Sequence, residues 1–330
     1  MRVAFLVHSP EVSGCRYRVL QYLPYLKDQG VEASVYFYGS AGLSRFRFYR
    51  TLDRYDVVYL HRKLFSPLEF WYVRKKARKL VFDFDDALMY RSSGSKNPHS
   101  VSRRLKFSRT VKGVDWVVAG NEFLKSETLP YQPNVSVVPT SIDLSRYGLK
   151  GASREDEGVI VGWMGSASTL KYLSHLMPAL ERVAQRCPQV RLKIVCDRFL
   201  ESSLLRVIKK PWSSEEEITD LQSFDIGIMP LSDDPWSRGK CALKIIQYFG
   251  VGVPVVCSPV GMNRDIVEDG VNGFWASKEG EWEDRLVRLV EAKDLRREMG
   301  LQGRRTVERG FTVEVNGPRI LNILRQVVGA

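Results

Sequence analysis

Short runs of β-branched and apolar residues alternate with stretches of helical periodicity along this chain, and no other feature restricts its fold as strongly. Strands separated by helices imply right-handed βαβ units, and such units build a mostly parallel sheet. In the first half the helical stretches are Tyr17–Gln29, closed by Gly30, and Leu68–Lys79. The expected strands there are Arg2–Val7, Glu32–Tyr38, Val57–His61, Leu80–Phe84, Trp116–Ala119 and Val135–Val138.

The same alternation starts again after Gly151–Gly158, a polar segment without an apolar period that is typical of a linker. The second set of expected strands is Val159–Trp163, Arg191–Val195, Ile226–Met229 and Pro254–Cys257. The second set of expected helices is Leu170–Arg186, Glu215–Leu221, Leu243–Phe249, Glu281–Met299 (ended by Gly300 and Gly303) and Val315–Val328.

These patterns predict an α/β protein of two Rossmann-like, doubly wound domains. We expect the first domain in residues 1–150, the linker in 151–158, the second domain in 159–310 and a C-terminal helix in 311–330 that packs back on the first domain. Domains of this kind bind ligands at the carboxyl ends of their strands, so the two are expected to face a central cleft.

Positive charge is concentrated in the first half of the chain. Residues 1–150 contain 25 Lys and Arg but 13 Asp and Glu, whereas residues 151–330 contain 25 of each. Such a field favours an anionic partner, namely a membrane surface, a phosphate-bearing lipid or a nucleic acid, unless the face is merely solvated. The chain lacks a recognised nucleic-acid-reading module, so we expect no nucleic acid partner.

The cysteines and histidines argue against a disulfide framework and a bound metal. The five cysteines are scattered, with no Cys-x-x-Cys pair, and the four histidines have no metal-ligand spacing. No apolar run reaches the roughly 18 residues that a membrane-spanning helix needs. We therefore expect a cytoplasmic, metal-independent protein.

The run from Arg238 to Gly261 resembles the nucleotide-sugar signature of family 4 glycosyltransferases, which have the GT-B fold and retain anomeric configuration. Segments that fit in the same order are Phe82–Ala87, Val138–Asp143, Trp163–Ser166, Asp225–Leu231 and Asp265–Phe274. The resemblance implies transfer of a hexosyl unit from a nucleoside diphosphate sugar, such as a UDP or GDP sugar, to a saccharide or lipid-linked saccharide. Bacterial cell-surface polysaccharide synthesis is the implied setting.

A turn of small residues after the strand Val159–Trp163 is the first candidate donor site. Gly165, Ser166, Ser168 and Thr169 open a helix, where exposed N–H groups and the helix dipole favour an anion. A simple Ser/Thr helix cap is the alternative. Lys171 lies near the position of the family's pyrophosphate-binding lysine, but Ser166 stands where the family has an arginine.

Three cations around the signature are candidate replacements for that arginine: Arg238, Lys240 and Lys244. Lys240 and Lys244 would share one helical face if the helix has already begun at Lys240. The resemblance also places Gln247 where the second glutamate of the family's acidic pair binds the ribose hydroxyls. Gly239 stands at the first glutamate, so a catalytically silent nucleotide-sugar-binding relative remains an alternative.

Two further segments of the second half are candidate donor contacts. Gly261, Met262 and Asn263 match the family's loop whose backbone amides face the donor. Trp212 could stack on the base, although a tryptophan after a proline is as often a local packing residue.

The first half carries the candidate catalytic and acceptor residues. Asp85 and Asp86 end an expected buried strand and could orient the acceptor hydroxyl, one of them as base, or act as structural caps. The loop residues Ser13, Gly14 and Arg16 could contact a phosphate or the acceptor, or merely connect a strand to a helix.

Aromatic and basic residues mix in Arg45–Arg50 and Phe65–Lys79. This composition suits peripheral contact with an anionic leaflet, with core packing of Phe70 and Trp71 as the alternative. A sugar-nucleotide epimerase shares the two-domain architecture and is a further alternative. No Gly-x-Gly-x-x-Gly follows the first strand, which disfavours a dehydrogenase.

Overall fold

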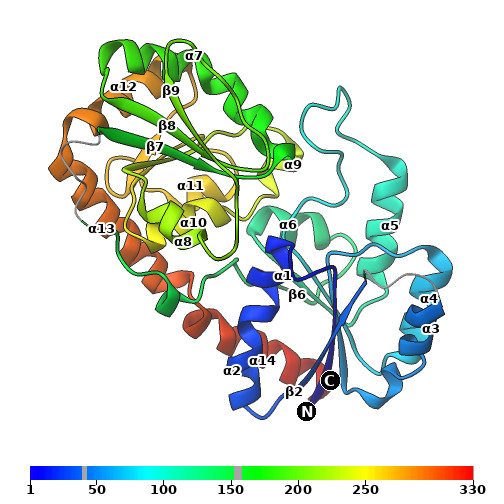
Figure 1. The fold of residues 1–330 in the computed structure, drawn as a ribbon. Coiled ribbons are helices and arrows are strands. Elements are labelled where there is room, and N and C mark those ends of the chain that lie inside the picture. The colour runs from blue at the N-terminus through cyan, green and yellow to red at the C-terminus, as the bar shows by residue number, and fades with distance from the viewer. Residues whose placement is uncertain (39–42, 152–157, 330) are drawn as a thin grey trace. The chain divides into compact units, whose positions relative to one another are not determined.

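Two six-stranded parallel sheets organise the chain, which a computed structural model describes at residues 1–38, 43–151 and 158–329 (Figure 1). Unit 1 comprises Met1–Ile142, Asp234–Cys241 and Phe311–Ala330, and unit 2 comprises Asp143–Asp233 and Ala242–Gly310. Residues 143–150 therefore group with the second unit and residues 234–241 with the first, unlike the bounds expected from sequence. Residues 152–157 of the expected linker lie outside the described residues.

The sheet of unit 1 has the strand order β2-β1-β3-β4-β5-β6, and all of its neighbouring strands are parallel. These strands are β1 (Arg2–Val7), β2 (Glu32–Phe37), β3 (Val57–His61), β4 (Leu80–Phe84), β5 (Trp116–Ala119) and β6 (Val135–Val137). β1, β3 and β4 are buried along nearly their whole length, as expected for strands covered on both faces.

Helices cover both faces of this sheet. Val3, Phe5 and Tyr59 pack with α1 (Ser13–Arg18), α2 (Leu23–Asp28) and α14 (Val313–Gly329) on one face. On the other face the ring of Phe84 contacts that of Phe107 in α5, with centroids 5.4 Å apart. The remaining helical elements of unit 1 are η1 (Leu20–Tyr22), α3 (Leu43–Tyr49), η2 (Leu52–Arg54), α4 (Pro67–Lys76), α5 (Val101–Lys112), α6 (Glu122–Thr128) and α9 (Pro235–Arg238).

The chain returns to unit 1 at its C-terminal end. The backbone N–H of Ile142 donates to the carbonyl of Phe311 (3.0 Å), and Asn316 in α14 donates from Nδ2 to Oγ of Ser141 (2.8 Å). Gly317 lies so close to Tyr25 of α2 that an added Cβ would meet its ring at 2.7 Å. This close helix packing holds α14 on the same sheet face as α2.

The sheet of unit 2 has the order β12-β11-β10-β7-β8-β9, again with every neighbouring pair parallel. Its strands are β7 (Val159–Met164), β8 (Val190–Val195), β9 (Arg206–Lys210), β10 (Ile226–Met229), β11 (Val255–Cys257) and β12 (Gly273–Trp275). Its helical elements are η3 (Leu144–Arg146), η5 (Ala167–Thr169), α7 (Leu170–Arg186), α8 (Glu217–Gln222), α10 (Leu243–Gly250), α11 (Met262–Ile266), α12 (Glu279–Glu291) and α13 (Lys293–Gly310).

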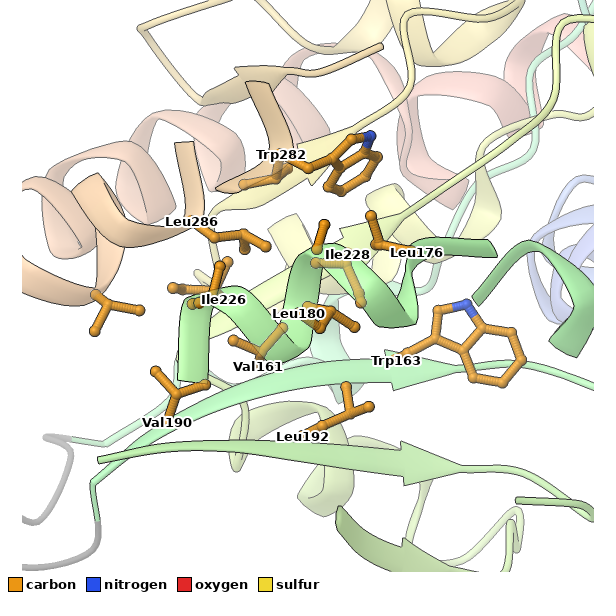
Figure 2. Close-up of a cluster of buried hydrophobic side chains, with 14 of the residues drawn as sticks. Val161, Trp163, Leu176, Leu180, Val190, Leu192, Ile226, Ile228, Trp282 and Leu286 are labelled. Carbon is orange, nitrogen blue, oxygen red and sulfur yellow. The ribbon is translucent and has the colours of Figure 1, made fainter. Parts of the chain in front are cut away.

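The core of unit 2 lies between its sheet and the helix pair α7 and α12. Trp163 and Ile228 from the strands meet Leu180 of α7 and Leu286 of α12 (Figure 2). Burying a side chain of this size contributes about 1.5–3 kcal/mol, so this layer anchors β7 and β10 firmly. The strands that carry the candidate donor turn are thereby held on a rigid base.

The expected helices Tyr17–Gln29 and Glu281–Met299 are wrong as continuous elements. The first is divided into α1, η1 and α2, and the second into α12 and α13. Gly300 and Gly303 do not end a helix but lie inside α13, where the absence of a side chain lets α13 pack closely against Gly252 and Phe249. An added Cβ at Gly300 would meet the carbonyl oxygen of Gly252 at 2.0 Å, and one at Gly303 would meet the ring of Phe249 at 2.4 Å.

Among the described residues, no helix combines the length and the hydropathy that crossing a lipid bilayer requires.

Candidate functional site

The strand order places predicted loops at the switch point of each sheet. In unit 1, β1 and β3 are neighbours whose following helices cover opposite faces, and in unit 2 the same holds for β7 and β10. Ligands of open parallel sheets bind outside the carboxyl ends of the strands at such points. Gly14 and Arg62 follow β1 and β3, and the turn from Gly165 to Thr169 follows β7.

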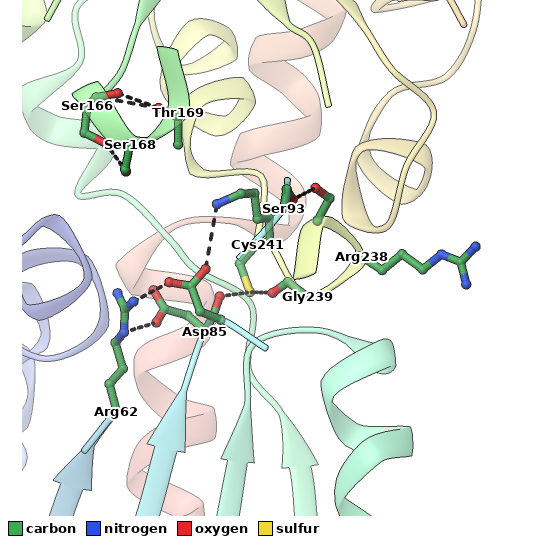
Figure 3. A network of polar contacts seen from close by, with 12 residues as sticks. Arg62, Asp85, Ser93, Ser166, Ser168, Thr169, Arg238, Gly239 and Cys241 are labelled. Atoms are coloured by element: carbon green, nitrogen blue, oxygen red, sulfur yellow. Dashed lines mark hydrogen bonds and ion pairs between the residues drawn. The ribbon is translucent and has the colours of Figure 1, made fainter. Parts of the chain in front are cut away.

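Arg62 lies at the switch point of unit 1, where it joins two aspartates, and sequence reasoning missed it. Its backbone is left-handed (φ 61°), a conformation that non-glycine residues adopt rarely and that clusters at functional sites. Its guanidinium pairs with Asp85 (Nε to Oδ1 3.3 Å) and with Asp86 (Figure 3). The two aspartates follow β4 directly, and their side chains are 13% and 17% exposed.

The arginines decide the charge of Asp85. Burial alone would raise the pKa of this carboxyl, but the positive charge around it, that of Arg62 above all, outweighs burial and lowers the pKa. Two adjacent carboxylates would otherwise raise one another's pKa. Asp85 is therefore an ionised group that can accept a hydrogen bond from a hydroxyl and cannot donate one.

Three further titratable groups lie beneath this pair. Arg18 and Asp83 form a completely buried ion pair, and Nη1 of Arg18 also donates to the carbonyl of Val138 (2.5 Å). His61 lies with Nε2 3.9 Å from Oδ1 of Asp85, and neither ring nitrogen has a hydrogen-bond partner among the described residues. Burial lowers the pKa of His61 to about 3, so this imidazole is neutral at pH 7.

The loop after β1 borders the same cluster through Gly14. An added Cβ at Gly14 would lie 2.7 Å from Nη1 of Arg62 and 3.2 Å from Oδ2 of Asp85, so only glycine permits this approach. Ser13 is exposed at the start of α1, and the guanidinium of Arg16 lies 5.2 Å from the ring of Tyr17. Of the three predicted loop residues, the structure brings Gly14 to the aspartates.

The segment Asp234–Cys241 lies on unit 1, beside the aspartates. Nδ2 of Asn121 donates to the carbonyls of Arg238 (3.3 Å) and Lys240 (3.1 Å), and Sγ of Cys241 donates to the carbonyl of Asp85 (3.3 Å). Nζ of Lys240 is 4.0 Å from Oδ1 of Asp86. The exposed side chain of Arg238 extends away from the cluster (Figure 3).

This placement corrects the expected geometry of the signature cations. Lys240 and Lys244 do not share a helical face, because α10 begins only at Leu243 and Ala242 has a left-handed backbone (φ 51°). Lys240 and Arg238 belong to unit 1, whereas Lys244 belongs to unit 2. A single helical cation clamp is therefore excluded for this run.

In unit 2 the turn after β7 satisfies many of its own polar groups. The backbone N–H of Ser166 donates to Oγ1 of Thr169 (3.3 Å), and the hydroxyls of Ser166 and Ser168 lie 2.9 Å apart. The N–H of Ala167 donates to Oδ1 of Asp197 (2.8 Å). These contacts show the helix-capping role that was the alternative explanation of this turn.

Gly165 and Lys244 meet at the ring of Trp163. An added Cβ at Gly165 would lie 2.4 Å from this ring, so the glycine makes room for the buried indole. Nζ of Lys244 lies 5.6 Å from the same ring. Lys171, one turn into the helical segment, has its Nζ 5.3 Å from the ring of Tyr172. Gly165 and Lys244 thus both lie against the indole of Trp163, the strand residue that precedes the turn.

Gln247 is buried beside a carboxylate that sequence reasoning missed. Its Nε2 donates to Oε1 of Glu217 (3.1 Å) and to the hydroxyl of Tyr147 (3.3 Å). Glu217 lies in α8 and is itself buried. An acidic side chain therefore accompanies the glutamine that the sequence resemblance places at the second position of the acidic pair. No sequence signal marks Glu217, since it lies 30 residues from Gln247 in a short helix.

The loop after β11 contributes backbone and not side chains to its surface. Gly261 has a positive φ of 53°, which glycine adopts without strain. Met262 and Asn263 are buried, and Nδ2 of Asn263 donates to the carbonyl of Ser258 (3.0 Å). Trp212 is half-buried in the segment after β9.

Within residues 1–38, 43–151 and 158–329, no three His, Cys, Asp or Glu side chains gather in a way that could hold a metal ion. The five cysteines are all buried and free.

Comparison with known proteins identifies the family that part of the chain matches and solved structures with the same fold. Residues 158–292 match the family described as Glycosyl transferases group 1. HepE from Anabaena, solved in complex with UDP and glucose, is 16% identical, with a TM-score of 0.76, and the match covers 99% of this chain and 100% of HepE. Comparison with curated proteins gives no significant match.

Two further solved structures agree over nearly their whole length. Sucrose-phosphate synthase from Thermosynechococcus elongatus is 14% identical with a TM-score of 0.78, and the lipopolysaccharide outer core galactosyltransferase WaaB is 14% identical with a TM-score of 0.63. Each match covers 99% of both chains. These likenesses confirm the predicted GT-B fold, with two parallel-sheet α/β domains.

Proposed function

We propose that this chain, in which residues 158–292 match the glycosyltransferase group 1 family and the fold is GT-B, transfers a hexosyl unit from a nucleoside diphosphate sugar. The acceptor is a hydroxyl of a saccharide or a lipid-linked saccharide, in the synthesis of a cell-surface polysaccharide or glycoconjugate. The reaction retains anomeric configuration and needs no metal. UDP is the first nucleotide to test, because HepE was solved with UDP and with UDP-glucose.

The observation that carries the proposal is that Gly165 and Lys244 both lie against Trp163, at the end of a strand that borders the switch point of unit 2. A diphosphate leaving group needs positive charge where its own negative charge develops. Lys244 supplies an ammonium beside the glycine turn, and Lys171 lies in the first turn of the following helix. These two lysines take the part of the divalent cation that other transferases use.

Unit 1 supports the acceptor half of the proposal. Asp85 is ionised and held by Arg62, so its carboxylate can accept the hydrogen bond of an acceptor hydroxyl and orient that oxygen. Arg62 above all keeps the carboxylate charged, and Gly14 lies close against both Arg62 and Asp85. In this assignment Asp85 positions the acceptor, and Arg62 positions Asp85.

The buried pair of Gln247 and Glu217 supports ribose binding in unit 2. An amide oxygen accepts hydrogen bonds as a carboxylate does, with less charge assistance. Because Nε2 of Gln247 donates to Glu217, the orientation of the amide is set by its partner.

The decisive experiment is a thermal-shift panel with UDP, GDP, dTDP and CMP compounds, each with and without EDTA. A ligand at 100 times its dissociation constant stabilises the protein by ~2.7 kcal/mol. We expect one nucleoside diphosphate to raise the melting temperature equally in both conditions. Lys244→Ala should reduce this shift, while the exposed control Lys293→Ala should retain it.

Three results would oppose different parts of the proposal. No shift with any nucleotide contradicts donor binding, and a shift lost in EDTA contradicts metal independence. A shift without sugar transfer or donor hydrolysis identifies a silent nucleotide-sugar-binding relative. An unchanged shift in Lys244→Ala removes that lysine from the site.

A further inference from the structure

The most exposed large apolar side chains of the described residues lie on two helices of unit 1. Leu68 and Trp71 of α4 are 72% and 56% exposed, and Val101 and Leu105 of α5 are 78% and 56% exposed. Val101 and Leu105 are four residues apart and therefore lie on one side of α5. We call α4 and α5, with these four side chains, the α4–α5 surface.

Sequence analysis left open whether Phe70 and Trp71 are core residues, and the structure divides them. Phe70 is buried, and its ring fills the space beside Gly113, where an added Cβ would meet it at 2.4 Å. Trp71 projects outward and contacts Nζ of Lys75, 5.0 Å from its ring. An exposed tryptophan beside a lysine contributes nothing to the core and calls for a partner.

Basic side chains surround these apolar groups. A hollow of about 360 Å³ between the helices is lined by Pro67, Phe70, Trp71, Arg74, Lys75 and Arg109. α5 has the sequence VSRRLKFSRTVK, with five basic residues and no acidic one. In α4 the acidic Glu69 is already engaged by the hydroxyl of Tyr49 (3.0 Å). Arg74 pairs with Asp115 (3.5 Å) and Arg104 with Glu127 (2.6 Å), yet the basic residues of α4 and α5 still outnumber the acidic ones. The α4–α5 surface therefore combines apolar groups with an excess of positive charge.

This combination fits an anionic phospholipid leaflet better than other partners. A second copy of the chain would bring the same positive face against itself, which repels. A nucleic acid would use flat rings for base stacking, whereas Leu68, Val101 and Leu105 are aliphatic. Tryptophan and aliphatic side chains enter the interfacial layer of a membrane, and lysine and arginine contact its phosphates.

We propose that the α4–α5 surface docks this glycosyltransferase on an anionic membrane. Trp71 and Leu68 enter the headgroup layer, and Lys75 and Arg109 bind lipid phosphates at the rim of the hollow. The purpose of this contact rests on the proposed function, since it brings the acceptor-binding unit to the surface that carries lipid-linked acceptors. The contact itself needs no donor and no catalysis.

The test is co-sedimentation of the full chain with phosphatidylcholine vesicles, with and without phosphatidylglycerol. Wild type should bind the anionic vesicles and release as salt is raised. Lys75→Glu/Arg109→Glu should lower the partition coefficient at least about tenfold, because each basic residue near an anionic leaflet contributes about 1 kcal/mol. Trp71→Ala should weaken binding while leaving the salt dependence unchanged.

The matched control is Arg319→Glu/Arg325→Glu, which makes the same charge change on exposed positions of α14. α14 packs on the sheet face opposite to α5, so this variant should keep wild-type binding. The proposal is overturned if both double variants lose vesicle binding equally. It is also overturned if wild type binds only the neutral vesicles, or binds no vesicles at all. All variants should keep the nucleotide thermal shift; its loss in wild type would refute the donor assignment and leave the vesicle result standing.

Discussion

His61 should make the stability of this protein depend on pH in a way that one substitution removes. Burial lowers the pKa of His61 from 6.5 to about 3, so the folded protein keeps it neutral where the unfolded chain binds a proton. The unfolded state therefore binds more protons between pH 6.5 and 3, and the free energy of unfolding falls as the pH falls through this window. At pH 5 the loss is ~2 kcal/mol, since one pKa unit corresponds to ~1.4 kcal/mol.

His61→Gln removes this titration while keeping a polar side chain of similar size. We expect urea unfolding, followed by tryptophan fluorescence, to give wild type ~2 kcal/mol less stability at pH 5 than at pH 7 from this group. The variant should lack that component. Asp83, whose pKa burial raises to about 6, contributes with the opposite sign in both proteins and cancels in the difference.

The control is His175→Gln, on an exposed position of α7. This variant should follow the wild-type pH dependence, because an exposed imidazole meets water in both states. Equal stability loss between pH 7 and pH 5 in wild type and His61→Gln would refute the neutral, buried histidine beside Asp85.

Two further predictions concern the two units separately. Gly14→Ala should slow sugar transfer by about tenfold or more, because the added Cβ displaces the guanidinium of Arg62. The UDP thermal shift should stay intact. An unchanged turnover number would show that the position of Arg62 does not affect the reaction. Gln247→Glu should destabilise the protein by about 2 kcal/mol or more at pH 7, because two buried carboxylates then face each other and one must bind a proton. Adding Glu217→Gln should restore stability in urea unfolding, and a double variant no more stable than the single one would contradict this pairing.

The strands could be predicted wherever they are buried on both faces. β1, β3, β4 and β10 are continuous apolar runs, so their bounds follow from composition alone. β9 and β12 could not be predicted in this way because neither has a long apolar run. β9 has the sequence RVIKK and is only partly buried, and β12 has three residues.

Part of the site could be predicted because its residues follow a strand. Asp85 and Asp86 come directly after the predicted strand Leu80–Phe84, and the topology carries them to the carboxyl end of their sheet. Arg62 also follows a predicted strand, but its pairing with these aspartates depends on the neighbouring strand order. The placement of Asp234–Cys241 on unit 1 depends on contacts with residues more than 100 positions away, such as that of Asn121 with Lys240. No local pattern encodes contacts of this kind, so sequence reasoning assigned the segment to the second domain.

The absence of the acidic pair at Gly239 and Gln247 follows from packing and charge in this chain. At Gly239 any side chain is excluded, because an added Cβ would lie 2.8 Å from the backbone nitrogen of Ala87. At Gln247 a neutral amide is required beside the buried Glu217, since a second carboxylate would repel it. Each departure from the family pattern thus has a local cause in the folded chain. A silent enzyme is not needed to explain either one, and transfer activity is the direct test.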